Sequence, residues 1–136
     1  MIVVDTSVLI DFFRGLETPA TARLAELNTE NRPFAIPGAC CQELLQGAKD
    51  EREWSLLAEY LGTQRILHPV DPWKTHVRAA RIYFDLRRRG VTVRSTVDCW
   101  IAQSVLEIEG TLLHDDEDFD RIAEIRELRA TRGSTS

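Results

Sequence analysis

Short apolar runs alternate with longer amphipathic segments along most of the chain. Runs of about three residues rich in Val, Ile, Leu and Phe predict short buried strands. Between them, apolar positions recur at the three- and four-residue spacing of a helix face. The predicted strands are residues 2–4, 34–36, 65–67, 111–113 and 127–129, and the predicted helices are residues 8–13, 18–29, 37–48, 51–61, 72–89, 96–109 and 116–125.

This alternation of strand and helix is typical of an α/β protein with a central parallel sheet. Strands that are apolar on both faces are buried between two layers of helices. We therefore predict an α/β/α sandwich around a short, mostly parallel sheet of four to five strands. At 136 residues the chain is long enough for one domain, which we place at residues 1–130, followed by a disordered tail at 131–136.

Composition favours a cytoplasmic protein without a membrane segment. No run approaches the roughly 20 apolar residues of a membrane helix. The N-terminal segment reaches Asp5 without the basic and then apolar stretch of a secretory signal. The three cysteines, an odd number without zinc-site spacing, predict reduced thiols rather than disulfides or a zinc site.

The net charge of −5 argues against nucleic-acid binding by bulk positive charge, since phosphate contacts depend on Lys and Arg. An acidic site occupied by a metal is compatible with that charge. Basic residues also gather in one stretch, which is either the solvated face of a helix or a track for RNA. These residues are Arg78, Arg81, Arg87, Arg88, Arg89 and Arg94.

Acidic residues stand directly after two predicted strands, Asp5 after the first and Asp116 after the fourth. In α/β folds, ligands bind beyond the carboxyl ends of the strands. Asp98 lies on the apolar face of its predicted helix, and Glu43 lies near the edge of another. A carboxylate near a core is costly unless it is paired, and Arg94 is the one basic residue nearby in sequence. A divalent cation that prefers oxygen ligands, Mg²⁺ or Mn²⁺, would compensate the charge of all these carboxylates at once.

Each carboxylate also has a purely structural interpretation. Asp5 and Asp116 fit helix N-caps, Asp98 fits a capping box with Ser95, and Glu43 fits a solvated helix residue. His114 adjoins the acidic residues and is either structural or in contact with a substrate. Gly-rich phosphate loops, Gly-x-Ser-x-Gly elbows and His-Glu-x-x-His motifs are absent from the sequence. Without a pair of catalytic histidines, a metal must generate the nucleophile.

Four segments in order make the chain resemble the PIN-domain ribonucleases, and among them the VapC-type toxins of bacterial toxin–antitoxin pairs. The resemblance covers essentially the whole chain. The segments are residues 2–10 with Asp5, residues 37–47 with Glu43, residues 96–102 with Asp98, and residues 112–119 with Asp116. Asp115 stands where Asn is frequent in the family, and Asp118 competes with Asp116 for the fourth acidic role.

The resemblance implies a PIN-like fold and an Mg²⁺- or Mn²⁺-dependent endoribonuclease that cuts structured cellular RNA, such as tRNA or rRNA. It also implies a homodimer that assembles into a larger complex with a small VapB-type antitoxin. The implied catalytic residues are Asp5, Glu43, Asp98 and Asp116, with Asp5, Asp98 and Asp116 as metal ligands. The implied supporting or substrate-binding residues are Thr6, Ser7, Asp115 and Asp118.

Two other classes of function use the same residues. A DNA nuclease or a phosphatase would also need clustered carboxylates, although the haloacid-dehalogenase phosphatases have Asp-x-Asp after the first strand and this chain has Ser7 at the third position. A non-catalytic protein- or RNA-binding PIN-like module would use the carboxylates only as helix caps.

Overall fold

The computed structural model describes residues 1–133, and its strands form one parallel sheet in the order β3-β2-β1-β4-β5. Each neighbouring pair of strands is parallel. The predicted α/β class and parallel sheet are therefore confirmed. The strands in the described part of the chain are β1 (Ile2–Val4), β2 (Phe34–Pro37), β3 (Arg65–Leu67), β4 (Thr111–Leu113) and β5 (Arg129–Thr131).

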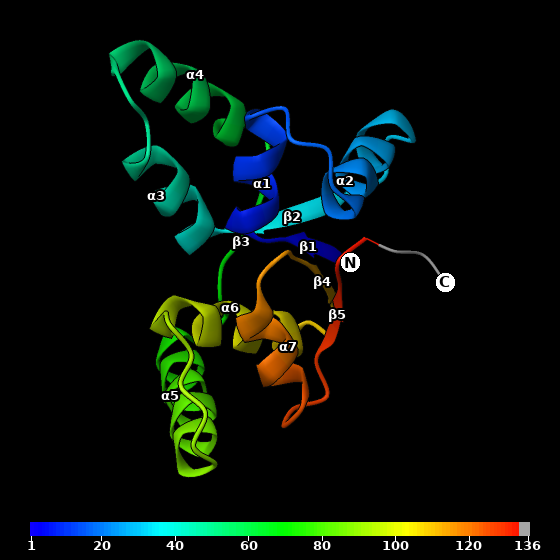
Figure 1. Cartoon of the computed structure of the whole chain (residues 1–136). Coiled ribbons are helices and arrows are strands. Elements are labelled where there is room, and N and C mark those ends of the chain that lie inside the picture. The colour runs from blue at the N-terminus through cyan, green and yellow to red at the C-terminus, as the bar shows by residue number, and fades with distance from the viewer. Residues whose placement is uncertain (134–136) are drawn as a thin grey trace.

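Helices cover both faces of the sheet, as the sequence predicts (Figure 1). α1 to α4 lie on one side of the sheet and α5 to α7 on the other. Their bounds are α1 (Thr6–Phe13), α2 (Pro19–Thr29), α3 (Gly38–Gln46), α4 (Glu51–Gly62), α5 (Pro72–Arg88), α6 (Thr96–Glu107) and α7 (Glu117–Ala123). None of the described helices has the length and apolar character needed to cross a bilayer.

The core lies on both sides of the central strands. Val3 and Val4 of β1 and Leu112 and Leu113 of β4 are fully buried. Successive residues of a strand point to opposite faces, so a strand between two helical layers has to be apolar at every position. This requirement explains why the central strands are continuous apolar runs rather than alternating ones.

The C-terminal end differs from the expected boundaries. β5 begins at Arg129 instead of residue 127, and it pairs with β4 through Thr111 and Leu113. Thr131 and Arg132, which the sequence analysis assigned to the tail, belong to the folded part, because Thr131 ends β5 and Arg132 forms ion pairs. Gly133 is also described, and its amide donates a hydrogen bond to the Thr131 hydroxyl. Residues 134–136 of the expected tail lie outside the described residues.

Candidate active site

The site is built at the carboxyl ends of β1 and β4. Asp5 follows β1 and caps α1, where its Oδ2 accepts hydrogen bonds from the Ser7 amide at 3.1 Å and the Ser7 hydroxyl at 2.7 Å. The Ser7 Oγ also accepts a hydrogen bond of 3.0 Å from the amide of Asp115, which follows β4. Ser7 thus joins two segments more than 100 residues apart, and it fixes the Asp5 carboxylate, which is only 4% exposed.

Two further helices bring their first turns to the same place. Asp98 lies in the first turn of α6, and Asp116 is the N-cap of α7. One oxygen from each of Asp98, Asp116 and Asp118 lies within 4.8 Å of the others. Because these helices begin at the same edge of the sheet, Asp98 meets two carboxylates from a distant part of the sequence.

Asp118 is fully buried, and both of its oxygens have partners. Oδ1 accepts a hydrogen bond of 2.7 Å from the Arg121 guanidinium, and Oδ2 accepts one of 3.0 Å from the Arg94 amide. These bonds attach the loop before α6 to the first turn of α7. Asp118 therefore holds these two segments of the site together. The side chains of Asp98 and Asp116 are less buried than that of Asp118.

Glu43 of α3 approaches the site from the opposite helical layer. The Thr6 hydroxyl donates a hydrogen bond of 2.9 Å to Glu43 Oε1. The charge of Glu43 is one cause that raises the pKa of Asp5. The thiol of Cys40, one turn before Glu43, lies 3.7 Å from Asp5 Oδ1 and donates a weak hydrogen bond to it. The sequence analysis did not assign Cys40 to the site.

The carboxylates oppose each other's ionisation. Burial and the charges of Asp5, Asp116 and Asp118 raise the pKa of Asp98 to about 8. Burial also raises the pKa of Asp5, and its hydrogen bonds from Ser7 offset this only in part. Mutual repulsion of this kind marks a site that is built to hold additional positive charge.

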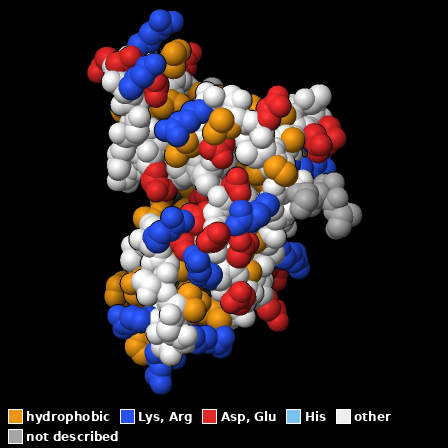
Figure 2. All heavy atoms as spheres, viewed as in Figure 1, with side chains coloured by type: hydrophobic (Ala, Val, Ile, Leu, Met, Phe, Trp, Pro, Cys, Tyr) orange, Lys and Arg blue, Asp and Glu red, His pale blue; other side chains and the backbone are white. Residues whose placement is uncertain are grey.

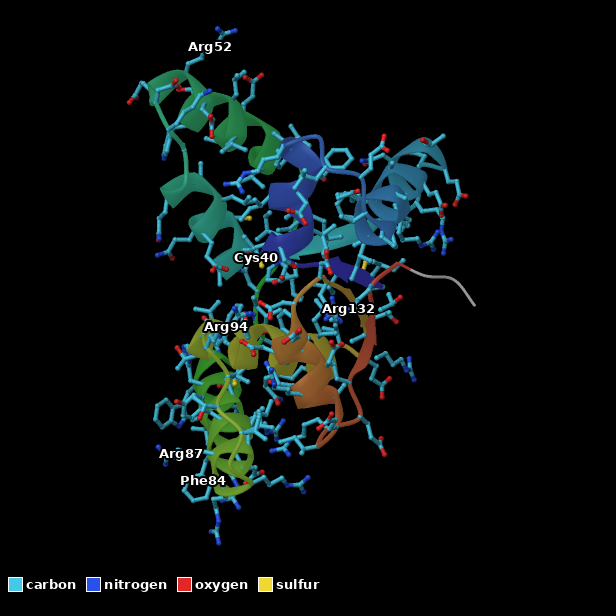
Figure 3. All side chains as sticks on the ribbon, viewed as in Figure 1. Cys40, Arg52, Phe84, Arg87, Arg94 and Arg132 are labelled. Atoms are coloured by element: carbon cyan, nitrogen blue, oxygen red, sulfur yellow. The ribbon has the colours of Figure 1, made fainter. Side chains whose placement is uncertain are left out.

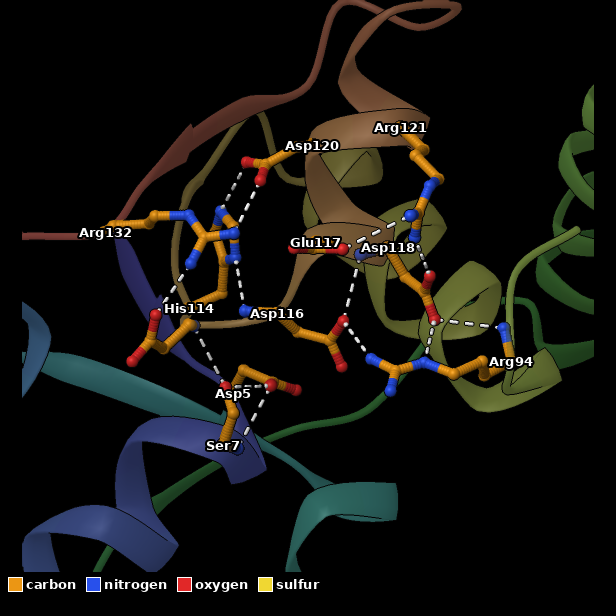
Figure 4. Close-up of polar contacts among 11 residues, drawn as sticks. Asp5, Ser7, Arg94, His114, Asp116, Glu117, Asp118, Asp120, Arg121 and Arg132 are labelled. Carbon is orange, nitrogen blue, oxygen red and sulfur yellow. Dashed lines mark hydrogen bonds and ion pairs between the residues drawn. The ribbon is translucent and has the colours of Figure 1, made fainter. Parts of the chain in front are cut away.

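Three arginines pair with the acidic residues, more than the single basic neighbour expected from sequence (Figure 4). Arg94 lies 3.2 Å from Asp116, Arg121 lies 2.7 Å from Asp118, and Arg132 lies 2.7 Å from Asp115. Arg132 was missed because it lies 17 residues from Asp115 in the sequence. Arg121 could have been found, because it lies three residues after Asp118, at a spacing that brings side chains together on one face of a helix. Within residues 1–133, no Lys or Arg forms an ion pair with Asp5, Glu43 or Asp98, so the central part of the cluster remains uncompensated.

His114 has a structural position. It is 1% exposed, and its Nδ1 accepts a hydrogen bond of 3.2 Å from the Asp116 amide. Burial lowers the pKa of His114, which keeps the ring neutral. Its Nε2 lies 3.6 Å from Asp120, a carboxylate that Arg132 also binds. This geometry favours the structural interpretation over contact with a substrate.

The predicted site residues thus fall into three groups. Asp98, Asp116 and Asp118 form one cluster, Asp5 lies close enough for its charge to act on Asp98, and Glu43 adjoins Asp5 across Thr6. The Val97 amide donates a hydrogen bond to the Ser95 hydroxyl, which caps α6. Among the described residues, no hydrogen bond from the Ser95 amide to the Asp98 carboxylate completes the expected capping box. In Figure 2 acidic and basic side chains gather on the face where the two helical layers meet.

The donor set suits a divalent cation. Carboxylate oxygens are the ligands that Mg²⁺ and Mn²⁺ prefer in proteins. Burial, and then the charges of Asp5 and Asp116, disfavour the ionised form of Asp98 and raise its pKa to about 8. A cation among these oxygens would remove that penalty, so the residues present fit a metal.

Comparisons with known proteins agree with this geometry. The family model described as the PIN domain matches residues 2–125. The VapC ribonuclease Mb1587 of Mycobacterium bovis and the ribonuclease VapC11 of Mycobacterium tuberculosis are each 34% identical over 131 residues, which covers 96% of this chain and 97% of theirs. The solved structure of VapBC-1 from nontypeable Haemophilus influenzae has a similar fold, with a TM-score of 0.75, 20% identity, and coverage of 96% of this chain and 97% of that one.

Proposed function

This chain belongs to the PIN-domain family, and from that premise we propose that it is a metal-dependent endoribonuclease toxin of a toxin–antitoxin pair. Its proposed substrate is structured cellular RNA, either tRNA or rRNA, and such a substrate places its activity in the cytoplasm. The observation that carries the proposal is the convergence of Asp98, Asp116 and Asp118, next to a buried Asp5, at the carboxyl ends of β1 and β4.

The proposed metal is Mg²⁺ or Mn²⁺, held by Asp5, Asp98 and Asp116. When bound, such a cation lowers the pKa of a water ligand and stabilises negative charge on the scissile phosphate. Asp98 would release its carboxyl proton to solvent on binding such a cation, since its pKa of about 8 keeps it mostly protonated at neutral pH.

The remaining residues position this centre. Ser7 holds the Asp5 carboxylate, and the Thr6 hydroxyl holds one oxygen of Glu43 and leaves the other free to accept a proton from water. Asp118 fixes the backbone of Arg94. The exposed guanidinium of Arg94, at the rim of the cluster, is placed to contact a phosphate oxygen.

The proposed partner is a small VapB-type antitoxin. A groove of about 660 Å³ runs between α1, α3 and α4, and exposed apolar side chains such as Phe13 and Leu56 line it. Glu43 also lines the groove, which therefore leads into the acidic site. An apolar antitoxin segment fits this groove, with an Arg or Lys reaching the carboxylates.

We also propose that the chain forms a homodimer. Light scattering measures the molar mass in solution, and a mass equal to that of one chain would contradict this proposal.

The test is cleavage of total tRNA and rRNA with Mg²⁺ or Mn²⁺. We expect the wild-type protein to cut RNA and the Asp5→Asn and Asp98→Asn variants to lose cleavage. Glu59→Gln is the control, because it removes an exposed carboxylate of α4 that has no ion pair within residues 1–133. Equal cleavage by all four proteins would refute the proposal.

A substrate panel separates the other enzyme classes. Single-stranded DNA and a chromogenic phosphomonoester are incubated with the same protein and metals. Cleavage of DNA at a rate equal to that of RNA, or turnover of the phosphomonoester, would contradict the proposed RNA specificity. A protein that binds RNA and cuts none of these substrates would instead support the non-catalytic alternative.

A further inference from the structure

Positive charge is concentrated in one part of this acidic protein. Residues 74–94 contain seven Lys or Arg and one acidic residue, Asp85, which gives this stretch a net charge of +6. The total of −5 then leaves −11 for the rest of the chain. A local field of this sign attracts a polyanion to one face while the remaining surface repels it.

The charge at the C-terminal end of α5 is not neutralised by neighbouring carboxylates. Arg81 pairs with Asp85 at 2.9 Å. In contrast, none of Arg87, Arg88 and Arg89 forms an ion pair within the described chain, and all three are exposed. Other basic residues of the described chain, such as Arg14, Arg52 and Arg65, also lack an ion pair. What distinguishes Arg87, Arg88 and Arg89 is that three such residues are consecutive.

An aromatic ring lies among these arginines. The Phe84 ring is 37% exposed, and the guanidinium carbons of Arg81, Arg88 and Arg87 lie 5.0, 5.6 and 6.0 Å from its centroid. Cation–π contacts hold the guanidinium groups near the ring. Exposed aromatic rings beside basic groups are the elements that bind single-stranded nucleic acid, through base stacking and phosphate contacts.

The loop after α5 connects this cluster to the candidate active site. Figure 3 shows Arg87 and Phe84 at the far end of α5 and Arg94 beside the site, on the same side of the sheet. Arg94 is 77% exposed and contacts Asp116. A surface depression of about 480 Å³ adjoins the loop, lined by Gly90, Val91, Thr92, Arg94, Glu117 and Arg121.

We propose that this surface, formed by Arg81, Phe84, Arg87, Arg88 and the loop to Arg94 and named here the arginine ridge, binds the single-stranded RNA that flanks the scissile phosphodiester. Arg87 and Arg88 contact phosphates, and a base stacks on Phe84. The inference rests on the proposed ribonuclease function and adds where the substrate lies. An acidic protein segment would also meet the charge, but it would not use the exposed ring.

The experiment measures RNA binding separately from cleavage. A fluorescein-labelled, single-stranded RNA of about 20 nucleotides is titrated with protein in EDTA, and anisotropy is followed at several NaCl concentrations. All proteins carry Asp98→Asn to prevent cleavage. The test variants are Arg87→Gln/Arg88→Gln and Phe84→Ala. The matched control is Arg52→Gln/Arg65→Gln, which removes two exposed arginines from other elements (Arg52 in Figure 3).

We expect Arg87→Gln/Arg88→Gln to weaken binding and to reduce the slope of log affinity against log salt by about 1.4, since each single-strand phosphate contact contributes about 0.7. Phe84→Ala should weaken binding about fivefold or more and leave the slope unchanged, because stacking releases no counterions. The control should match the parent protein. Thermal unfolding of each variant verifies its folding.

The possible results separate a failure of the arginine ridge as an RNA-binding surface from a failure of the proposed ribonuclease function. Equal affinity and slope in the parent, ridge and control proteins would overturn the ridge, and so would equal losses in the ridge and control variants. If the wild-type protein cuts RNA but the ridge variants bind it normally, the ribonuclease function stands and the ridge fails. If the wild-type protein does not cut RNA, the proposed function fails on its own. A labelled polyglutamate peptide is titrated in the same way. Ridge variants that lose binding to this peptide but keep their RNA binding would also refute the ridge.

Discussion

Replacing Asp98 by Asn should stabilise the metal-free protein while abolishing its activity. In the folded chain the pKa of Asp98 rises from 3.8 to about 8, chiefly because of burial and then because of Asp5 and Asp116. A raised carboxyl pKa means that the folded state binds an extra proton between about pH 4 and 8. The free energy of unfolding therefore falls as pH rises through this window.

The size of the effect follows from the shift. At 1.36 kcal/mol per pKa unit, about four units set a ceiling of about 5–6 kcal/mol above pH 8. Asp98 is only partly shielded from solvent, and screening reduces the expected gain to about 2 kcal/mol. For a chain of this length, that gain corresponds to a rise in Tm of roughly 4–8 °C.

The assay is thermal unfolding in EDTA at pH 5, 6, 7 and 8. We expect the Tm of Asp98→Asn to exceed that of the wild type by a margin that grows with pH and is largest at pH 8. Glu59→Gln is the control and should match the wild type at every pH. Adding Mn²⁺ in excess over EDTA should raise the Tm of the wild type and of Glu59→Gln, but not that of Asp98→Asn. If the variant is no more stable than the wild type at pH 8, the ionised Asp98 carboxylate does not destabilise the folded protein, and the reasoning is refuted.

Two further substitutions test the residues that position the site. Asp118→Ala should lower the free energy of unfolding by about 2–3 kcal/mol, because it removes a fully buried carboxylate bound to Arg121, and urea unfolding measures this loss; a loss below about 0.5 kcal/mol would contradict the anchoring role. Thr6→Val should lower kcat about tenfold with KM within about twofold, because Glu43 loses its hydrogen bond. An unchanged kcat in a steady-state cleavage assay would remove Thr6 from the site.

Much of the fold could be predicted because its strands are buried on both faces. The short apolar runs at β1 and β4, each followed by a helical pattern, favour buried parallel strands. The location of the site followed from the same reasoning, since Asp5 and Asp116 come directly after parallel strands whose carboxyl ends share one edge. The alternation of strands and helices was therefore sufficient to place both acidic segments at one edge of the sheet. That β1 and β4 are neighbours in this sheet came from the structure.

Contacts that depend on three-dimensional packing could not be predicted. Ser7 and Asp115 are 108 positions apart, and the sequence holds no pattern that marks their hydrogen bond. The pair of Arg132 with Asp115 exists only because β5 adds to the edge of β4, and β5 itself begins two residues later than expected. A three-residue strand at a sheet edge has too weak an apolar pattern to fix its own limits.

Arg94 shows the limit in a different way. The sequence placed it near Asp98, but not against Asp116, which lies 22 positions away and binds it at 3.2 Å. The position of its guanidinium depends on Asp118, which holds the Arg94 amide. A basic residue was therefore predicted in the right neighbourhood, and its partner was set by the meeting of the α6 and α7 first turns.

The most direct test of the central claim is titration of the metal-free protein with Mn²⁺ by calorimetry at pH 7, in two buffers with different ionisation enthalpies. The account predicts saturable binding with release of about 0.9 proton per ion, because Asp98, with a pKa of about 8, must ionise to bind the cation. It also predicts that Asp98→Asn shows no such binding. Equal heats from the wild type and the variant, or wild-type binding without proton release, would contradict the claim that these carboxylates form a metal site.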